Sequence, residues 1–99
     1  MASLATSLFL PSLSVVSLNV NGLRDHNKRR KVFLQLLGTG AQVFYLQETH
    51  TTPADEEPWR LEWEQQGGGQ IFFSHGEFNS CGTAIMFLED FKPEFPLPK

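Results

Sequence analysis

The first half of the chain alternates between short apolar runs and one stretch whose apolar residues have helical spacing. Residues 15–20 have the length and β-branched content of a strand, and Asn21 and Gly22 follow with the residues that turns prefer. The apolar residues at helical spacing are Val32, Phe33, Leu36 and Leu37. This pattern predicts a helix with Asn27 as its N-cap and Gly38 at its end.

The next apolar run, residues 43–46, contains no alternating polar positions. A run of this kind predicts a strand that is covered on both faces. The order strand, helix, strand, with a crossover of this length, makes the two strands parallel, so their C-terminal ends lie at the same edge of the sheet. Asn19 and Glu48 stand at those two ends, and we therefore expect them to be neighbours.

A short helix is expected in the second half of the chain. Residues 52–55 resemble a capped helix start, but Pro58 would interrupt a helix that began there. The pattern therefore favours a turn followed by a helix over 58–65. Trp59 and Trp63, four residues apart, would share the buried face of this helix.

Two further strands follow the helix. The glycines at 67–69 would end it and permit a sharp reversal. Residues 70–74 and 83–88 have the apolar, β-rich composition of strands, and the polar residues 75–80 would join them as a loop. The simplest arrangement is an antiparallel pair, and the fold class predicted for the whole chain is α/β.

With 99 residues, of which 40% are apolar and 19% charged, the chain has the material for one globular domain. We expect a flexible tail over 1–12, a partial domain over 13–89 and a Pro-rich tail over 90–99. The apolar residues 8–16 could be taken for a signal-peptide core, but Pro11 interrupts them and no basic segment precedes them, which favours a strand with a loose tail. No run approaches the roughly 18 apolar residues of a transmembrane helix, so no membrane partner is expected.

The charge of the chain is uneven. A net charge of −3 and a pI near 5.5 argue against a strongly basic nucleic-acid-binding protein. Five of the eight Lys and Arg residues nevertheless fall between Arg24 and Lys31. Such a cluster is either a solvated helix face or an attractor of anions. The single cysteine, Cys81, favours an intracellular location and is expected to be a small buried apolar residue rather than a nucleophile.

Glu48 and Asn19 are the candidate site residues. A carboxylate at the rim of a parallel sheet is a natural ligand for Mg²⁺, which activates water and neutralises charge on a phosphate. The alternative for Glu48 is a solvated strand end. Asn19 would either hydrogen-bond Glu48 or bond the turn that follows it. His50 could support the site from two residues away, but a histidine on the surface or at the entry to a helix is the expected interpretation.

Three segments resemble the N-terminal half of the endonuclease/exonuclease/phosphatase superfamily. Residues 17–23 read Ser-Leu-Asn-Val-Asn-Gly-Leu, 46–50 read Leu-Gln-Glu-Thr-His and 81–86 read Cys-Gly-Thr-Ala-Ile-Met. The chain is most similar to the endonuclease domain of LINE-type retrotransposon proteins, which is related to apurinic/apyrimidinic endonucleases. The resemblance covers roughly 13–88 and implies a truncated four-layer α/β sandwich, DNase I-like, of which this chain is the N-terminal half.

The resemblance also implies a function. The intact domain would hydrolyse DNA phosphodiester bonds with Mg²⁺ or Mn²⁺, Glu48 would bind the metal and Asn19 would help arrange the site. Arg24 and Lys28 would contact DNA phosphates, since the loop after the first strand lies near DNA in that family. The location would then be nuclear.

The chain departs from the family pattern. It has no Gly-Asp-Phe-Asn-like segment and no Ser-Asp-His segment, which supply the family's other catalytic Asp, Asn and His. Without these groups we expect no catalysis by the chain alone, so whether it is an enzyme stays open. Two alternatives remain: a non-catalytic relic or small interaction protein, whose uncovered sheet face would pair with other chains or a second copy, and a fragment of a phosphatase of the same superfamily.

Overall fold

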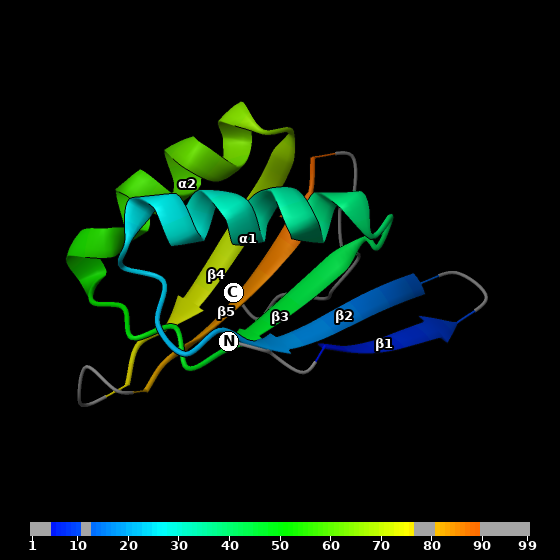
Figure 1. Ribbon diagram of the computed structural model, residues 1–99, viewed down its shortest axis with the longest axis horizontal. Coiled ribbons are helices and arrows are strands. Elements are labelled where there is room, and N and C mark those ends of the chain that lie inside the picture. Colours follow the sequence, from blue (N-terminus) through cyan, green and yellow to red (C-terminus); the bar gives the residue numbers. More distant parts are fainter. Residues whose placement is uncertain (1–4, 11–12, 77–80, 90–99) are drawn as a thin grey trace, which may run out of the picture.

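A mixed sheet with both helices on one side forms the body of the protein (Figure 1). The computed structural model describes residues 5–10, 13–76 and 81–89. The strands are β1 (Ala5–Leu10), β2 (Leu13–Asn19), β3 (Val43–Gln47), β4 (Gly68–Ser74) and β5 (Thr83–Leu88). The α-helices are α1 (His26–Gly38) and α2 (Glu56–Gln65), and the short 3₁₀ turn η1 (Pro53–Asp55) precedes α2. The strand order across the sheet is β1-β2-β3-β5-β4.

The strand pairing confirms the predicted α/β class. Strands β2 and β3 are parallel, with Asn19 opposite Gln47 at the last paired position. The pairs β3–β5 and β4–β5 are antiparallel, as predicted for β4 and β5. One sheet with one layer of helices is compatible with half of a four-layer sandwich.

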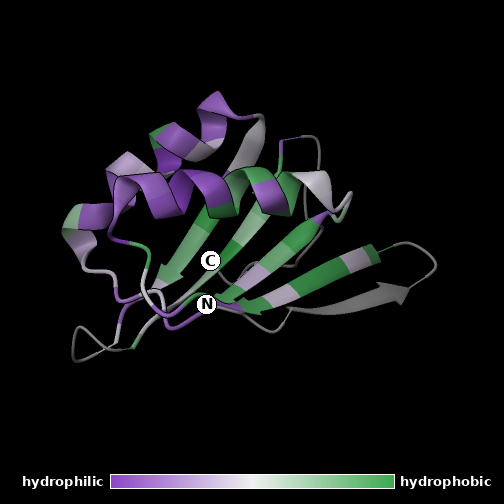
Figure 2. Ribbon diagram, viewed as in Figure 1, coloured by the Kyte–Doolittle hydropathy of each residue, from purple (hydrophilic) through white to green (hydrophobic). Residues whose placement is uncertain are grey.

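Aromatic side chains fill the space between the helices and the sheet. Phe33 of α1 and Phe44 of β3 both contact Trp63 of α2 edge-on, with ring centroids 5.2 and 5.6 Å apart. Trp59 and Trp63 are fully buried, as their spacing predicted. The indole Nε1 of Trp63 donates to the carbonyl of Phe87 at 2.9 Å, so the ring is both packed and hydrogen-bonded. In Figure 2 the central strands are mostly apolar and the outward faces of the helices are polar.

Helix α1 begins two residues earlier than predicted. Its N-cap is Asp25, whose carboxylate accepts from the backbone N–H of Lys28 at 3.0 Å, and the prediction of Asn27 was wrong. Both side chains can cap a helix. The extended backbone of Asp25, at φ −70° and ψ 121°, places its carboxylate at the first turn.

Helix α2 also begins earlier than predicted, at Glu56. Pro58 lies in its first turn, where backbone N–H groups have no partner within the helix and a proline is tolerated. The preceding turn η1 is held by Asp55, whose carboxylate accepts from the backbone N–H of Thr52 at 2.7 Å. The capped start predicted at 52–55 is therefore present as η1, and α2 follows it directly and includes Pro58.

Two expectations about strands need correction. Residues 5–10 pair with β2 as strand β1, where a flexible tail was expected. Strand β3 is not covered on both faces: Phe44 and Leu46 are buried, but Val43 and Tyr45 are only partly covered. The helices lie on one side, so on the other side Phe72 and Ile85 remain 51% and 38% exposed. The Pro-rich residues 90–99 and part of the predicted loop, 77–80, lie outside the described residues.

Within the described ranges, no helix has the length and apolar character needed to cross a membrane.

Candidate metal-binding site

Asn19 and Glu48 meet at the edge of the sheet, as the parallel pairing predicted. The amide Nδ2 of Asn19 donates to Oε2 of Glu48, while Oδ1 of the same amide accepts from the backbone N–H of Asn21 at 3.1 Å. The two alternative roles of Asn19 are therefore both present. The amide bonds the turn on one side and orients the carboxylate on the other.

The backbone around this pair is strained. Asn21, Glu48 and His50 have φ values of 49°, 54° and 56°, and within the described part of the chain no other non-glycine residue has a positive φ. A left-handed conformation costs a non-glycine residue about 1–2 kcal/mol. Such strain gathers at functional sites, where the surrounding structure holds it in place.

Backbone hydrogen bonds on both sides keep residues 48–50 in this conformation. On one side the carbonyls of Glu48 and Thr49 accept from Gly22 and Leu23, at 2.7 and 3.1 Å. On the other side the N–H groups of Thr49 and His50 donate to the carbonyls of Gly82 and Cys81, at 3.1 and 2.9 Å. Residues 48–50 thus continue β3 beyond its last strand residue, and they lie between two other segments of the protein, 22–23 and 81–82.

Two glycines allow this close approach. A Cβ at Gly22 would lie 2.8 Å from Nδ1 of His50, and a Cβ at Gly82 would lie 2.7 Å from Oγ1 of Thr49. Both glycines have positive φ values, 88° and 111°, which favour a residue without a Cβ. The glycines of the 17–23 and 81–86 segments are therefore required by the geometry of the loop.

The exposed carboxylate of Glu48 fits part of a Mg²⁺ site. Its side chain is 48% exposed, its Oε2 is oriented by Asn19, and its Oε1 lies 4.0 Å from Nε2 of His50. Mg²⁺ commonly takes one or two carboxylates and keeps several waters, so one oriented carboxylate can contribute to a site without completing it. Among the described residues, no three His, Cys, Asp or Glu side chains are grouped closely enough to hold a metal ion.

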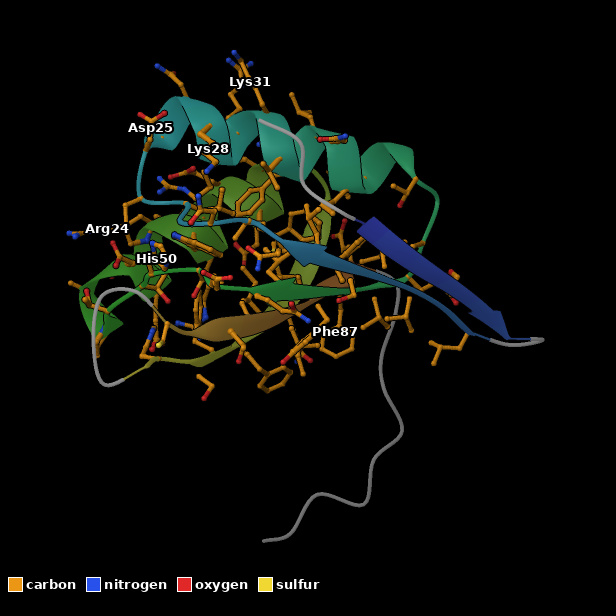
Figure 3. All side chains as sticks on the ribbon, turned by 60° about the horizontal axis from the view of Figure 1, so that its bottom comes forward. Arg24, Asp25, Lys28, Lys31, His50 and Phe87 are labelled. Atoms are coloured by element: carbon orange, nitrogen blue, oxygen red, sulfur yellow. The ribbon has the colours of Figure 1, made fainter. Side chains whose placement is uncertain are left out.

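His50 lies beside this pair without a hydrogen bond to it. Its Nε2 is buried and has no hydrogen-bond partner among the residues that the structure describes, and the ring packs against Gly22. The expected surface histidine is therefore half-buried. Figure 3 shows its side chain at the same end of the molecule as Arg24.

The basic cluster divides into different roles. Arg24 is exposed, whereas the ammonium of Lys28 donates to the carbonyls of Val20 and Asn21 at 2.9 and 3.3 Å. Lys28 thereby holds the loop that follows Asn19. An ammonium has three protons to donate, and these bonds use two. Contact of Arg24 and Lys28 with DNA phosphates stays a prediction.

Arg29 belongs to the protein interior. Its guanidinium forms two hydrogen bonds with the carboxylate of Glu62, at 2.8 and 2.6 Å, and donates to the carbonyl of Leu23 at 2.9 Å. Burial raises the pKa of Glu62, but the hydrogen bond and positive charge of Arg29, together with the neighbouring His26, outweigh this effect and lower it from 4.5. This pair ties α1 to α2 and to the loop that begins after β2.

Sequence reasoning missed a hydrogen-bonded chain of four side chains beside the site. Oγ1 of Thr49 lies 2.9 Å from Oγ1 of Thr51, which lies 3.0 Å from Nδ1 of His75, and Nε2 of His75 lies 2.7 Å from Oε2 of Glu56. The hydrogen bond from His75 lowers the pKa of Glu56. The only hint in the sequence is the alternation of Thr49 and Thr51, which is too common to single out.

Cys81 is exposed, and the expectation that it is buried was wrong. Its backbone carbonyl accepts from His50, so the residue serves the loop through its main chain.

No protein-family model matches the chain. The chain is 42% identical over 83 residues to a curated relative, the "Transposon TX1 uncharacterized 149 kDa protein" of Xenopus laevis. The match covers 84% of this chain and 6% of that protein, so the chain spans a small part of the relative's length. The chain is thus similar to part of a transposon protein.

Proposed function

We propose that this chain is part of a Mg²⁺-dependent endonuclease domain of a retrotransposon-type protein that hydrolyses DNA phosphodiester bonds. The observation that carries the proposal is the Asn19–Glu48 pair, an oriented and exposed carboxylate on a strained loop at the edge of two parallel strands. The similarity to a transposon protein supports the proposed source, and the motif resemblance supports the proposed chemistry.

Glu48 would hold the metal, Mg²⁺ or Mn²⁺, and Asn19 would keep its carboxylate in one orientation. The bound ion supplies neutralisation of the charge that develops on the scissile phosphate. Asn19 donates to one carboxylate oxygen, which leaves the other directed toward solvent and His50. The left-handed backbone of Glu48 sets where the carboxylate lies relative to the sheet edge.

Hydrolysis would also need a group to activate water and groups to bind the phosphate. The proposal assigns these to Gly-Asp-Phe-Asn-like and Ser-Asp-His segments, which the 99 residues do not contain. Removing catalytic groups that act together costs several orders of magnitude in rate. We therefore expect no nicking by these 99 residues alone.

Sequencing the transcript through the codon for Lys99 tests this proposal. A reading frame that continues into both segments supports it. The longer product should then nick supercoiled plasmid DNA with Mg²⁺, and Glu48→Gln should abolish nicking while Glu64→Gln, which removes the same charge from an exposed helix position, should not. A stop codon, or nicking that survives Glu48→Gln, contradicts it.

One observation favours a second function as a small interaction protein. Phe72 and Ile85, paired across β4 and β5, expose apolar surface on the side of the sheet opposite the helices. Exposed apolar patches of this kind mark surfaces that bind other chains. Sedimentation of the chain over a range of concentrations tests this alternative, since self-association through that face would be weakened by Phe72→Ser.

A further inference from the structure

The chain of hydrogen bonds from Glu56 to Thr49 ends inside the strained segment that presents Glu48. Thr49 and Thr51 are buried to 0% and 2% exposure, so their hydroxyls depend on partners within the protein. Their partners are each other and Nδ1 of His75. Buried polar groups in such a network have fixed positions, because each lost bond leaves a group unsatisfied.

His75 is held by Glu56 and Phe73 as well as by Thr51. Its Nε2 bonds Glu56, which also forms an ion pair with Arg60 at 3.1 Å. Its ring stacks on Phe73, with centroids 5.4 Å apart, and the guanidinium of Arg60 lies 5.3 Å from the centroid of the same phenyl ring. The first turn of α2 and the end of β4 therefore clamp the imidazole in one orientation.

We propose that His75 is a positioning residue for the metal site, acting through Thr51 and Thr49 on the left-handed conformation of Glu48 and His50. This inference rests on the proposed function, because it concerns the same carboxylate. Main-chain hydrogen bonds to Gly82 and Cys81 hold residues 48–50 on one side. The side chain of Thr49 holds the same segment through its hydroxyl, which contacts the hydroxyl of Thr51. Outer partners of metal ligands commonly change metal affinity by about 10–100-fold when removed.

The test compares Thr51→Val, which removes the linking hydroxyl with little change of shape, with Thr51→Ser, which retains it. Two quantities are measured on the full 99-residue chain: the hydrogen-exchange rates of the Thr49 and His50 amides by NMR, and the affinity for Mn²⁺ from paramagnetic broadening. Leu36→Val, in the core under α1, serves as a control for general loss of stability.

We expect Thr51→Val to speed exchange of both amides at least about tenfold and to weaken Mn²⁺ binding about tenfold, and Thr51→Ser to restore both. Leu36→Val should leave both near the wild-type values. Unchanged amide exchange in Thr51→Val overturns the inference, as does an equal effect of Leu36→Val.

The two proposals fail separately. If the wild-type chain does not bind Mn²⁺ near Glu48, the metal site is refuted, while amide exchange still reports on the positioning of the loop. Should Thr51→Val fail to fold, the same two measurements on His75→Phe test whether His75 positions the loop. This variant keeps a ring against Phe73 and removes both hydrogen bonds of the imidazole.

Discussion

The core under the helices and the loop edge that carries Asn19 and Glu48 are stabilised in different ways. In the core, fully buried aromatic rings contact one another edge-on, and their strands and helices have ordinary backbone conformations. At the loop edge, three non-glycine residues have left-handed conformations and two buried threonines depend on hydrogen bonds. Packing in the core therefore stabilises the folded state, while the left-handed backbone at the loop edge destabilises it.

This difference indicates where function is expected. A strained backbone that hydrogen bonds hold in place is retained when the position of a side chain matters more than local stability. Glu48 is the one acidic residue of the described chain with such a backbone, and its carboxylate remains half-exposed. The following changes test the contrast, in order of decreasing expected effect.

Trp63→Ala should have the largest effect on the free energy of unfolding, a loss of about 3–5 kcal/mol. The ring is fully buried, contacts Phe33 and Phe44, and donates a hydrogen bond to Phe87. Urea denaturation followed by circular dichroism measures the loss. Leu61→Ala, on the exposed side of the same helix, should change stability by no more than about 0.5 kcal/mol, and an equal loss in both variants would refute this description of the core.

Arg29→Met should cost about 3 kcal/mol, because it leaves the carboxylate of Glu62 partly buried and without its main partner. The double variant Arg29→Met/Glu62→Leu should be more stable than Arg29→Met, since no unpaired charge remains. Thermal and urea denaturation of both variants measure this difference. A double variant that is less stable than Arg29→Met would contradict the cost assigned to the unpaired carboxylate of Glu62.

Low pH should lower the free energy of unfolding through the same ion pair, and the loss should be smaller than the loss caused by Arg29→Met. The folded state lowers the pKa of Glu62, so its contribution is fully present above the ordinary value of 4.5 and is lost as the pH falls through the folded-state pKa. Glu56, whose pKa is also lowered, contributes in the same direction. Stability measured from pH 7 downward should decline less steeply below about pH 4.5 in the double variant than in the wild type.

At Glu48 the usual order of alanine and glycine should be reversed. Both substitutions remove the hydrogen bond from Asn19, but only glycine accepts φ 54° without strain, so Glu48→Gly should be more stable than Glu48→Ala by about 1 kcal/mol. At Glu64, in helix α2, alanine should be the more stable by about 1 kcal/mol. The same order at both positions would contradict a left-handed backbone at Glu48.

Much of the fold follows from local sequence patterns. Strands β2, β4 and β5 and the paired tryptophans of α2 were predicted because apolar periodicity reports which side of an element is buried. The meeting of Asn19 and Glu48 was predicted because parallel strands end at one edge.

The features that were missed depend on partners distant in the sequence. Arg29 is buried because Glu62, 33 positions away, neutralises it, and a basic cluster in the sequence gives no indication of which member is paired. Likewise, His75 joins Thr51 and Glu56 only after β4 has folded back along α2. Hydrogen bonds to neighbouring segments of the protein impose the left-handed conformation of Glu48, so the residue types in this stretch do not predict it.

The most direct test of the metal site is an NMR titration of the 99-residue chain with Mn²⁺, compared with Glu48→Gln and the control Glu64→Gln. We predict that the amide signals of Asn19, Glu48 and His50 broaden first, that Glu48→Gln abolishes this effect, and that Glu64→Gln retains it. Broadening that is strongest elsewhere, or that persists in Glu48→Gln, would contradict the assignment of Glu48 as a metal ligand.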